Sequence, residues 1–196
     1  YQKFKNYFDV LTYDLDKSKC NSTLEDVTFK CNIIFLCLPT PMNTNGSCNV
    51  DILQKQLENI DLITDNQETK KTIVIKSTVS PGTTARWNSL YSSLDLVFNP
   101  EFLTEANAIE DFNNQNRIIL GGPRPATTEL RRLYSKVFPK AHIIKTDSTH
   151  AEMVKYLTNS FLATKVSFAN EIYQVCEKLK IDYDKVCLLY TSDAAD

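Results

Sequence analysis

The sequence predicts an α/β fold in which a doubly wound, mostly parallel sheet is followed by one long helix. Three observations support this prediction: β-branched runs alternate with helical patterns, two runs are almost continuously apolar, and a long helical pattern begins near residue 148. Continuous apolar runs are typical of strands covered on both faces, as in parallel sheets. Alternation of strands and helices predicts the doubly wound arrangement.

Six segments have the apolar, β-branched composition of strands. They are residues 9–13, 32–38, 72–76, 95–98, 117–121 and 142–145. Helical spacing is found between them at residues 50–63, 83–92 and 127–137. The last of these follows Pro125 and begins with two threonines and a glutamate, which is a typical helix start.

Residues 149–179 are predicted to form a single long helix, because breakers are few and apolar residues recur near the 3.6-residue helical period. These apolar residues fall on more than one face, which predicts burial between layers or domains. We expect a domain boundary near residue 147, so that residues 1–147 and 148–187 belong to different domains. Residues 188–196 are predicted to be an atypical tail that is foreign to the chain.

Composition limits the class of protein. A chain of 196 residues with 42% hydrophobic content suffices for one domain and part of a second. The net charge of −2 gives no general nucleic-acid signal. No apolar run approaches the roughly 20 residues that span a bilayer, and the first residues lack the apolar segment of a signal peptide. The chain does not start with Met, as expected if it begins inside a longer protein.

The six cysteines predict neither a disulfide scaffold nor a metal site. No Cys-x-x-Cys pair occurs, and His142 and His150 lie far from any cysteine cluster, so we expect no zinc. Cys37 in an apolar strand and Cys176 on an amphipathic helix are expected to be reduced core residues. This cysteine use predicts a cytoplasmic protein.

Two carboxylates follow the strand-like run at residues 94–98. Glu101 and Glu105 are four positions apart, so a helical turn entered after Pro100 would place them on one side. Paired acids at the end of a strand are typical of chemistry in α/β enzymes. Equally, glutamates are favoured in the first turn of an ordinary helix by its macrodipole.

Two further loops follow apolar strands. Residues 37–41 end on Thr40 and Pro41, and prolines here stop the strand and stiffen a loop that can face a ligand. Residues 76–84 place hydroxyls and backbone N–H groups at a strand-to-helix turn, which suits phosphate or carboxylate binding. The alternatives are a plain strand-stop loop for the first and N-capping by Ser80 or Thr83 for the second.

Three polar residues have both a functional and a structural interpretation. Asp14 ends an early strand-like run, where an acid could bind a ribose diol, although no Gly-x-Gly-x-x-Gly turn occurs before it. A simple turn aspartate is the alternative. Lys155 and Asn159 share one face of the long helix among apolar neighbours. Such a lysine either extends to solvent or is functional.

Taken together, these segments resemble the UDP-glucose/GDP-mannose dehydrogenase family. The matching motifs occur in the family's order at residues 36–41, 76–84, 99–105, 108–118, 151–161 and 163–171. The resemblance covers nearly the whole chain to about residue 186. It implies a Rossmann-like NAD-binding domain over residues 1–147, without its first strand, and the start of a central helical dimerisation domain over residues 148–187.

The resemblance also implies an activity. NAD would oxidise the C6 alcohol of a nucleotide sugar to a carboxylate in two hydride transfers, with UDP-glucose the favoured substrate. Glu101 would assist water or proton transfer and Thr78 would hold that water, while Lys155 and Asn159 would stabilise the oxyanion at C6. By the same resemblance, NAD would be bound by Asp14, Thr40, Pro41, Ser77, Thr78 and Glu105.

The sequence departs from the family pattern in ways that limit this expectation. The Gly-rich turn and the loop that bears the family's nucleophilic cysteine are not found in these residues, and none of the six cysteines stands in that motif. We therefore expect a fragment that cannot complete the four-electron reaction, whose full-length parent forms a homodimer through the long helix. The alternatives are a non-catalytic nucleotide-binding or interaction module and a two-electron hydroxyacid-type dehydrogenase.

Overall fold

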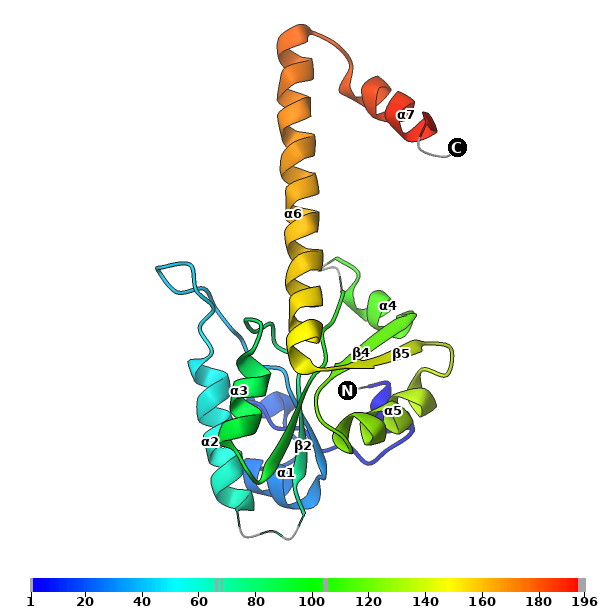
Figure 1. Cartoon of the computed structure of the whole chain (residues 1–196). Coiled ribbons are helices and arrows are strands. Elements are labelled where there is room, and N and C mark those ends of the chain that lie inside the picture. Colours follow the sequence, from blue (N-terminus) through cyan, green and yellow to red (C-terminus); the bar gives the residue numbers. More distant parts are fainter. Residues whose placement is uncertain (1, 66, 68, 104–105, 194–196) are drawn as a thin grey trace. The chain divides into compact units, whose positions relative to one another are not determined.

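The computed structural model describes residues 2–65, 67, 69–103 and 106–193, with side chains to residue 190. Its contacts divide the chain into two units, Tyr1–Lys155 and Tyr156–Asp196. The elements are η1 (Phe4–Asn6), η2 (Lys17–Lys19), α1 (Leu24–Lys30), β1 (Ile33–Leu36), α2 (Asp51–Thr64), β2 (Lys71–Ile75), α3 (Thr83–Leu90), β3 (Leu94–Phe98), α4 (Ala108–Asn113), β4 (Arg117–Gly121), α5 (Ala126–Val137), β5 (His142–Thr146), α6 (Ser148–Leu179) and α7 (Tyr183–Asp193) (Figure 1).

The five strands form one sheet in the order β1-β2-β3-β4-β5. All neighbours are parallel except β3 and β4, which meet antiparallel where Phe98 lies opposite Gly121. Five of the six predicted strands are therefore present, with ends within two residues of the prediction. The expected mostly parallel α/β sheet is confirmed.

Helices cover both faces of this sheet, as alternate residues of β2 show. Ile73 and Ile75 pack into a cluster with buried residues of α2 and α3, including Trp87. Val74 points to the opposite cluster, which contains Leu130 of α5. Because all three β2 residues are fully buried, their burial on both faces explains the continuous apolar run in the sequence.

The strand predicted at residues 9–13 does not form. The backbone N–H of Thr12 donates to Asn21 Oδ1 at 2.6 Å, and the N–H of Asp14 donates to Cys20 Sγ at 3.0 Å. Side chains of the same segment thus occupy the donors that a sheet ladder would need. The segment has the composition of a strand, but its local polar partners decide the conformation.

The long helix α6 begins at Ser148, where Asp147 Oδ1 accepts the N–H of His150 at 3.0 Å, and ends at Leu179. The predicted bounds are confirmed. In the second unit, however, Leu157, Phe161 and Phe168 are 65%, 62% and 67% exposed. These side chains are exposed in the single chain, so the expected burial between layers or domains stays a prediction, whereas Cys176 is buried as expected.

Candidate functional site

The carboxyl ends of β1, β2 and β3 form one edge of the sheet. The register pairs Leu36 with Ile75 and Ile75 with Phe98, so the three strands end side by side. Loops of residues 37–41, 76–82 and 99–103 follow them. In open α/β sheets ligands bind outside the carboxyl ends of parallel strands. This edge therefore carries the candidate site.

Two hydroxyl groups join the first two loops. Ser77 Oγ donates to the carbonyl of Leu38 at 2.6 Å and accepts the Leu38 N–H at 3.0 Å. Thr40 Oγ1 donates to the carbonyl of Thr78 at 2.8 Å. The structure thus brings together Thr40, Ser77 and Thr78, with exposed Pro41 next along the chain. These hydrogen bonds fix the relative position of the two loops.

Asn99 is the polar centre beneath the site. It is 2% exposed, and its Nδ2 donates to the carbonyl of Ile119 at 2.8 Å. Its Oδ1 accepts hydrogen bonds from Lys76 Nζ at 3.1 Å and from the Tyr134 hydroxyl of α5. Complete burial raises the pKa of Tyr134, so the phenol stays neutral and remains a donor. One buried amide therefore connects β2, β3, β4 and α5.

Two lysines approach Glu101 from different elements. Lys76 Nζ lies 3.9 Å from Glu101 Oε2, and Lys155 Nζ of α6 donates to the main-chain carbonyl of Glu101 at 2.6 Å. Burial lowers the pKa of both lysines, and the Glu101 carboxylate opposes this effect. Both Lys155 and Arg117 lie over the ring of Phe102: the Lys155 Nζ is 5.8 Å and the Arg117 Cζ is 4.6 Å from the ring centre. Such desolvated cations suit a substrate oxygen on which negative charge develops.

The turn before α3 binds a carboxylate that belongs to the protein itself. Glu152 of α6 is fully buried, and its two oxygens accept the N–H groups of Gly82 at 2.6 Å and Thr84 at 2.9 Å. Gly82 has φ +91°, a left-handed conformation that a side chain would strain. The anion-binding interpretation of this turn thus holds with an internal ligand, and N-capping by Ser80 or Thr83 is wrong: neither side chain caps α3.

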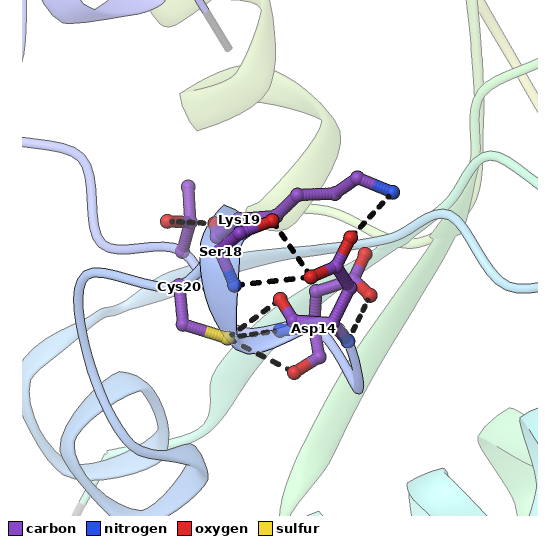
Figure 2. A network of polar contacts seen from close by, with 6 residues as sticks. Asp14, Ser18, Lys19 and Cys20 are labelled. Atoms are coloured by element: carbon purple, nitrogen blue, oxygen red, sulfur yellow. Dashed lines mark hydrogen bonds and ion pairs between the residues drawn. The ribbon is translucent and has the colours of Figure 1, made fainter.

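Asp14 lies in an exposed loop and not at the end of a strand. Its Oδ1 accepts the N–H of Asp16 at 2.9 Å, and its carbonyl accepts the Cys20 thiol at 2.9 Å. Figure 2 shows this network, in which Asp16 also accepts the N–H of Ser18 and pairs with Lys19 at 3.3 Å. The ribose-binding role of Asp14 stays a prediction, but the strand expected to present it is not there.

Three predicted residues remain: Glu105, Asn159 and Cys37. Glu105 lies outside the described residues. Asn159 is exposed in the second unit, four positions after Lys155 in the same helix. Cys37 is exposed beyond the end of β1, so the core role expected for it is wrong. Its local surroundings nevertheless desolvate the sulfur and raise the pKa of the thiol.

Three contributors to this site were missed in the sequence. Lys76 and Asn99 are the first residues after β2 and β3, and a polar residue directly after each of two buried strands could have indicated them. Glu152 gives no comparable signal. It reads as an ordinary glutamate near a helix start, and only its contacts with residues 68 and 70 positions earlier reveal its burial.

Within the described ranges, no helix is long and apolar enough to cross a membrane. The described residues also contain no group of three or more His, Cys, Asp or Glu side chains that could hold a metal ion.

Two stretches of the sequence match models of one known protein family. Residues 9–138 match the NAD binding domain of the UDP-glucose/GDP-mannose dehydrogenase family, and residues 149–195 match the family's central domain. The chain belongs to the UDP-glucose/GDP-mannose dehydrogenase family. The resemblance inferred from the motifs is thereby confirmed.

Curated relatives of the dehydrogenase family agree. UDP-glucose 6-dehydrogenase TuaD of Bacillus subtilis is 35% identical over 162 residues, which cover 79% of this chain and 34% of that protein. UDP-glucose 6-dehydrogenase AglM of Haloferax volcanii is 31% identical over 166 residues, covering 78% of this chain and 39% of the relative. The chain thus spans little more than a third of the length of these relatives.

Solved structures of the dehydrogenase family share the fold. A ternary complex of GDP-mannose dehydrogenase from Pseudomonas aeruginosa aligns with TM-score 0.77 and 26% identity, over 86% of this chain and 41% of that one. A UDP-glucose dehydrogenase from Pyrobaculum islandicum aligns with TM-score 0.75 and 31% identity, over 83% of this chain and 39% of that one.

The residues at the sheet edge fit a nicotinamide dinucleotide in part. Side-chain hydrogen bonds join the loops after β1 and β2, and this rigid edge suits the binding of a nucleotide. The N-terminus of α3 does not fit a pyrophosphate, because the carboxylate of Glu152 already accepts the N–H groups of Gly82 and Thr84. Among the described residues, this leaves the loops after β1 and β2 as the candidate contacts for the dinucleotide.

Proposed function

We propose that the protein takes part in NAD-dependent oxidation of the C6 alcohol of a nucleotide sugar to the uronic acid, with UDP-glucose the favoured substrate. GDP-mannose and UDP-N-acetyl-aminosugars are the next candidates. The observation that carries this proposal is the position of the Lys155 ammonium, 2.6 Å from the Glu101 carbonyl at the carboxyl edge of the sheet.

The side chains have separate roles in this proposal. The desolvated Lys155 ammonium binds the C6 oxygen and stabilises negative charge on it, and Asn159 adds an amide donor. Glu101, next to the Lys76 ammonium, accepts a proton from the C6 hydroxyl or from a water held by Thr78. In this proposal Lys155 and Glu101 are preorganised: the ammonium and the carboxylate are already at the site before charge develops on the substrate.

NAD, when bound, accepts the hydride. The residues that would hold it are Thr40, Pro41, Ser77 and Thr78 in the two joined loops, together with Asp14 and Glu105. The hydroxyl contacts keep these loops in a fixed relation, so they could hold a dinucleotide without rearrangement of the sheet edge.

Binding of UDP-glucose to the chain tests this proposal. We expect saturation-transfer NMR to detect UDP-glucose, and Lys155→Met to weaken that binding about tenfold, the worth of one charge-assisted hydrogen bond. Lys165→Met is the matched control, since Lys165 is an exposed lysine of the same helix that lies over Phe161. Equal binding by the two variants would contradict the assignment of Lys155.

We further propose a homodimer formed through α6. Leu157, Phe161 and Phe168 of the second unit are more than 60% exposed, and a row of large apolar side chains on one helix is typical of an interface. Sedimentation velocity should show a concentration-dependent dimer that Phe161→Ser weakens. Ser167→Ala, an exposed change on the same helix that removes no apolar surface, should leave it intact.

A further inference from the structure

Glu152 joins two parts of the site that are far apart in the sequence. It lies in the second turn of α6, three positions before Lys155, so both side chains occupy neighbouring positions on the helix. Its carboxylate binds the turn that directly follows Ser77 and Thr78, through Gly82 and Thr84.

The same turn of α6 is also packed tightly against β4. A Cβ at Gly121 would lie 2.5 Å from Ala151 Cβ and 2.8 Å from the Asp147 carbonyl, so only glycine admits this approach. Ala151 is fully buried. The packing at Gly121 sets the distance of α6 from the sheet, and the two hydrogen bonds of Glu152 set its rotation and its advance toward α3.

We propose that Glu152 is a positioning residue for Lys155. By holding the first turns of α6 against the start of α3, it places the Lys155 ammonium on the Glu101 carbonyl and fixes it relative to the Thr78 loop. The proposal rests on the role of Lys155 given above. The hydrogen bonds of Glu152 go to the backbone N–H groups of Gly82 and Thr84, and not to Ser77 or Thr78, which are proposed to hold NAD.

The pKa of Lys155, followed by its ¹³Cε chemical shift against pH and assigned with Lys155→Met, tests the proposal. Burial lowers this pKa below the ordinary 10.5. In Glu152→Gln one carboxylate oxygen is replaced by an amide that cannot accept, so α6 loosens, Lys155 becomes more hydrated, and its pKa should rise. Loss of a negative charge would by itself lower a lysine pKa, so a rise cannot be direct electrostatics.

Thr23→Ala is the matched control. It removes the cap of α1, where Thr23 Oγ1 accepts the Asp26 N–H at 3.1 Å, and should leave the pKa of Lys155 unchanged. An unchanged or lowered pKa in folded Glu152→Gln, with folding judged by the fluorescence of fully buried Trp87, would overturn the proposal. A rise in the pKa of Lys155 in both variants would also overturn the proposal, because loss of an unrelated helix cap would then have the same effect as loss of the Glu152 contact.

Should Glu152→Gln not fold, amide hydrogen exchange in the wild type decides. Slow exchange of the Gly82 and Thr84 N–H groups supports the contact with Glu152, whereas exchange as fast as that of exposed loop amides overturns it. Neither measurement uses NAD or a nucleotide sugar. Failure of the proposed function would therefore appear in the binding experiments and leave the response of Lys155 to Glu152 intact.

Discussion

Asn99 and Asn21 are the same residue type in two different kinds of network. Asn99 is buried beneath the candidate site and bonds Lys76, which directly follows β2, and residues of β4 and α5, 20 to 35 positions away. Asn21 is exposed and bonds Thr12 and Val10, 9 and 11 positions away. The carboxyl edge of the sheet is therefore built by long-range contacts, and the segment around Asp14 by local ones.

This difference explains where function can be precise. A long-range hydrogen bond to buried Asn99 holds Lys76 in place, because an unpaired buried group is costly. Local exposed bonds can exchange with water at little cost. We therefore expect the carboxyl edge of the sheet to be a preorganised site. The conformation of the Asp14 loop should depend mainly on hydrogen bonds between residues close in the sequence.

The largest effect should come from Asn99→Ala. It leaves the Lys76 ammonium and the Tyr134 hydroxyl without their shared acceptor, and should lower the free energy of unfolding by about 3 kcal/mol. Asn21→Ala, the matched change in the local network, should cost about 1 kcal/mol or less. Urea denaturation measures both, and similar losses would remove the distinction between the two regions.

A smaller effect is expected for Gly121→Ala. The new Cβ would lie 2.5 Å from Ala151 Cβ, and such overpacking costs about 2 kcal/mol. Gly46→Ala is the control without crowding, since nothing lies within 4 Å of its added Cβ and only φ +83° opposes it, at about 1 kcal/mol. Thermal unfolding compares the two; an equal or larger loss at Gly46 would contradict tight packing of α6 on β4.

The pH dependence of stability should distinguish Lys76 from an exposed lysine. Burial places its folded-state pKa below 10.5, so as pH rises through that folded pKa toward 10.5 the unfolded chain holds the extra proton. The contribution of Lys76 to the free energy of unfolding therefore increases with pH in this window. The difference between wild type and Lys76→Met should grow accordingly. Lys17→Met, at an exposed position, is the control; the same pH dependence for the two variants would contradict burial of Lys76.

Cys20→Ala should have the smallest effect. The thiol donates to the Asp14 carbonyl and accepts the Asp14 N–H, but sulfur hydrogen bonds are weak and the loop is exposed. We expect a loss of about 0.5 kcal/mol or less in urea denaturation. A loss as large as that of Asn99→Ala would show that the Asp14 loop is more than a local turn.

The two regions also differ in how far the sequence predicts them. The continuous apolar run at β2 identifies a strand because every residue in it is buried, whichever face it is on. Residues 9–13 have the composition of a strand, but the side chains of Asn21 and Cys20 accept the N–H groups of Thr12 and Asp14, and composition does not report such contacts. Helix α1 was missed even though Thr23 and Asp26 form a capping pair that indicates its start.

The candidate site was predicted in parts. Motif order located Glu101, Thr78 and Lys155, and two of them are joined in the structure by the bond from Lys155 to the Glu101 carbonyl. The support beneath them, Asn99 with Lys76 and Tyr134, depends on contacts between residues 23 and 35 positions apart and has no local pattern. Sequence spacing predicts residues on one element well, and contacts between elements poorly.

NAD binding at the joined loops tests the central claim most directly. Saturation-transfer NMR with millimolar NAD should give transfer to the nicotinamide and adenine protons in the wild type. It should be reduced several-fold in Thr40→Val, which removes the hydrogen bond to the Thr78 carbonyl. Thr164→Val, which removes an equally short bond to a carbonyl within α6, should bind as the wild type does. No transfer in the wild type, or equal transfer in both variants, would contradict a dinucleotide site at the carboxyl ends of β1 and β2.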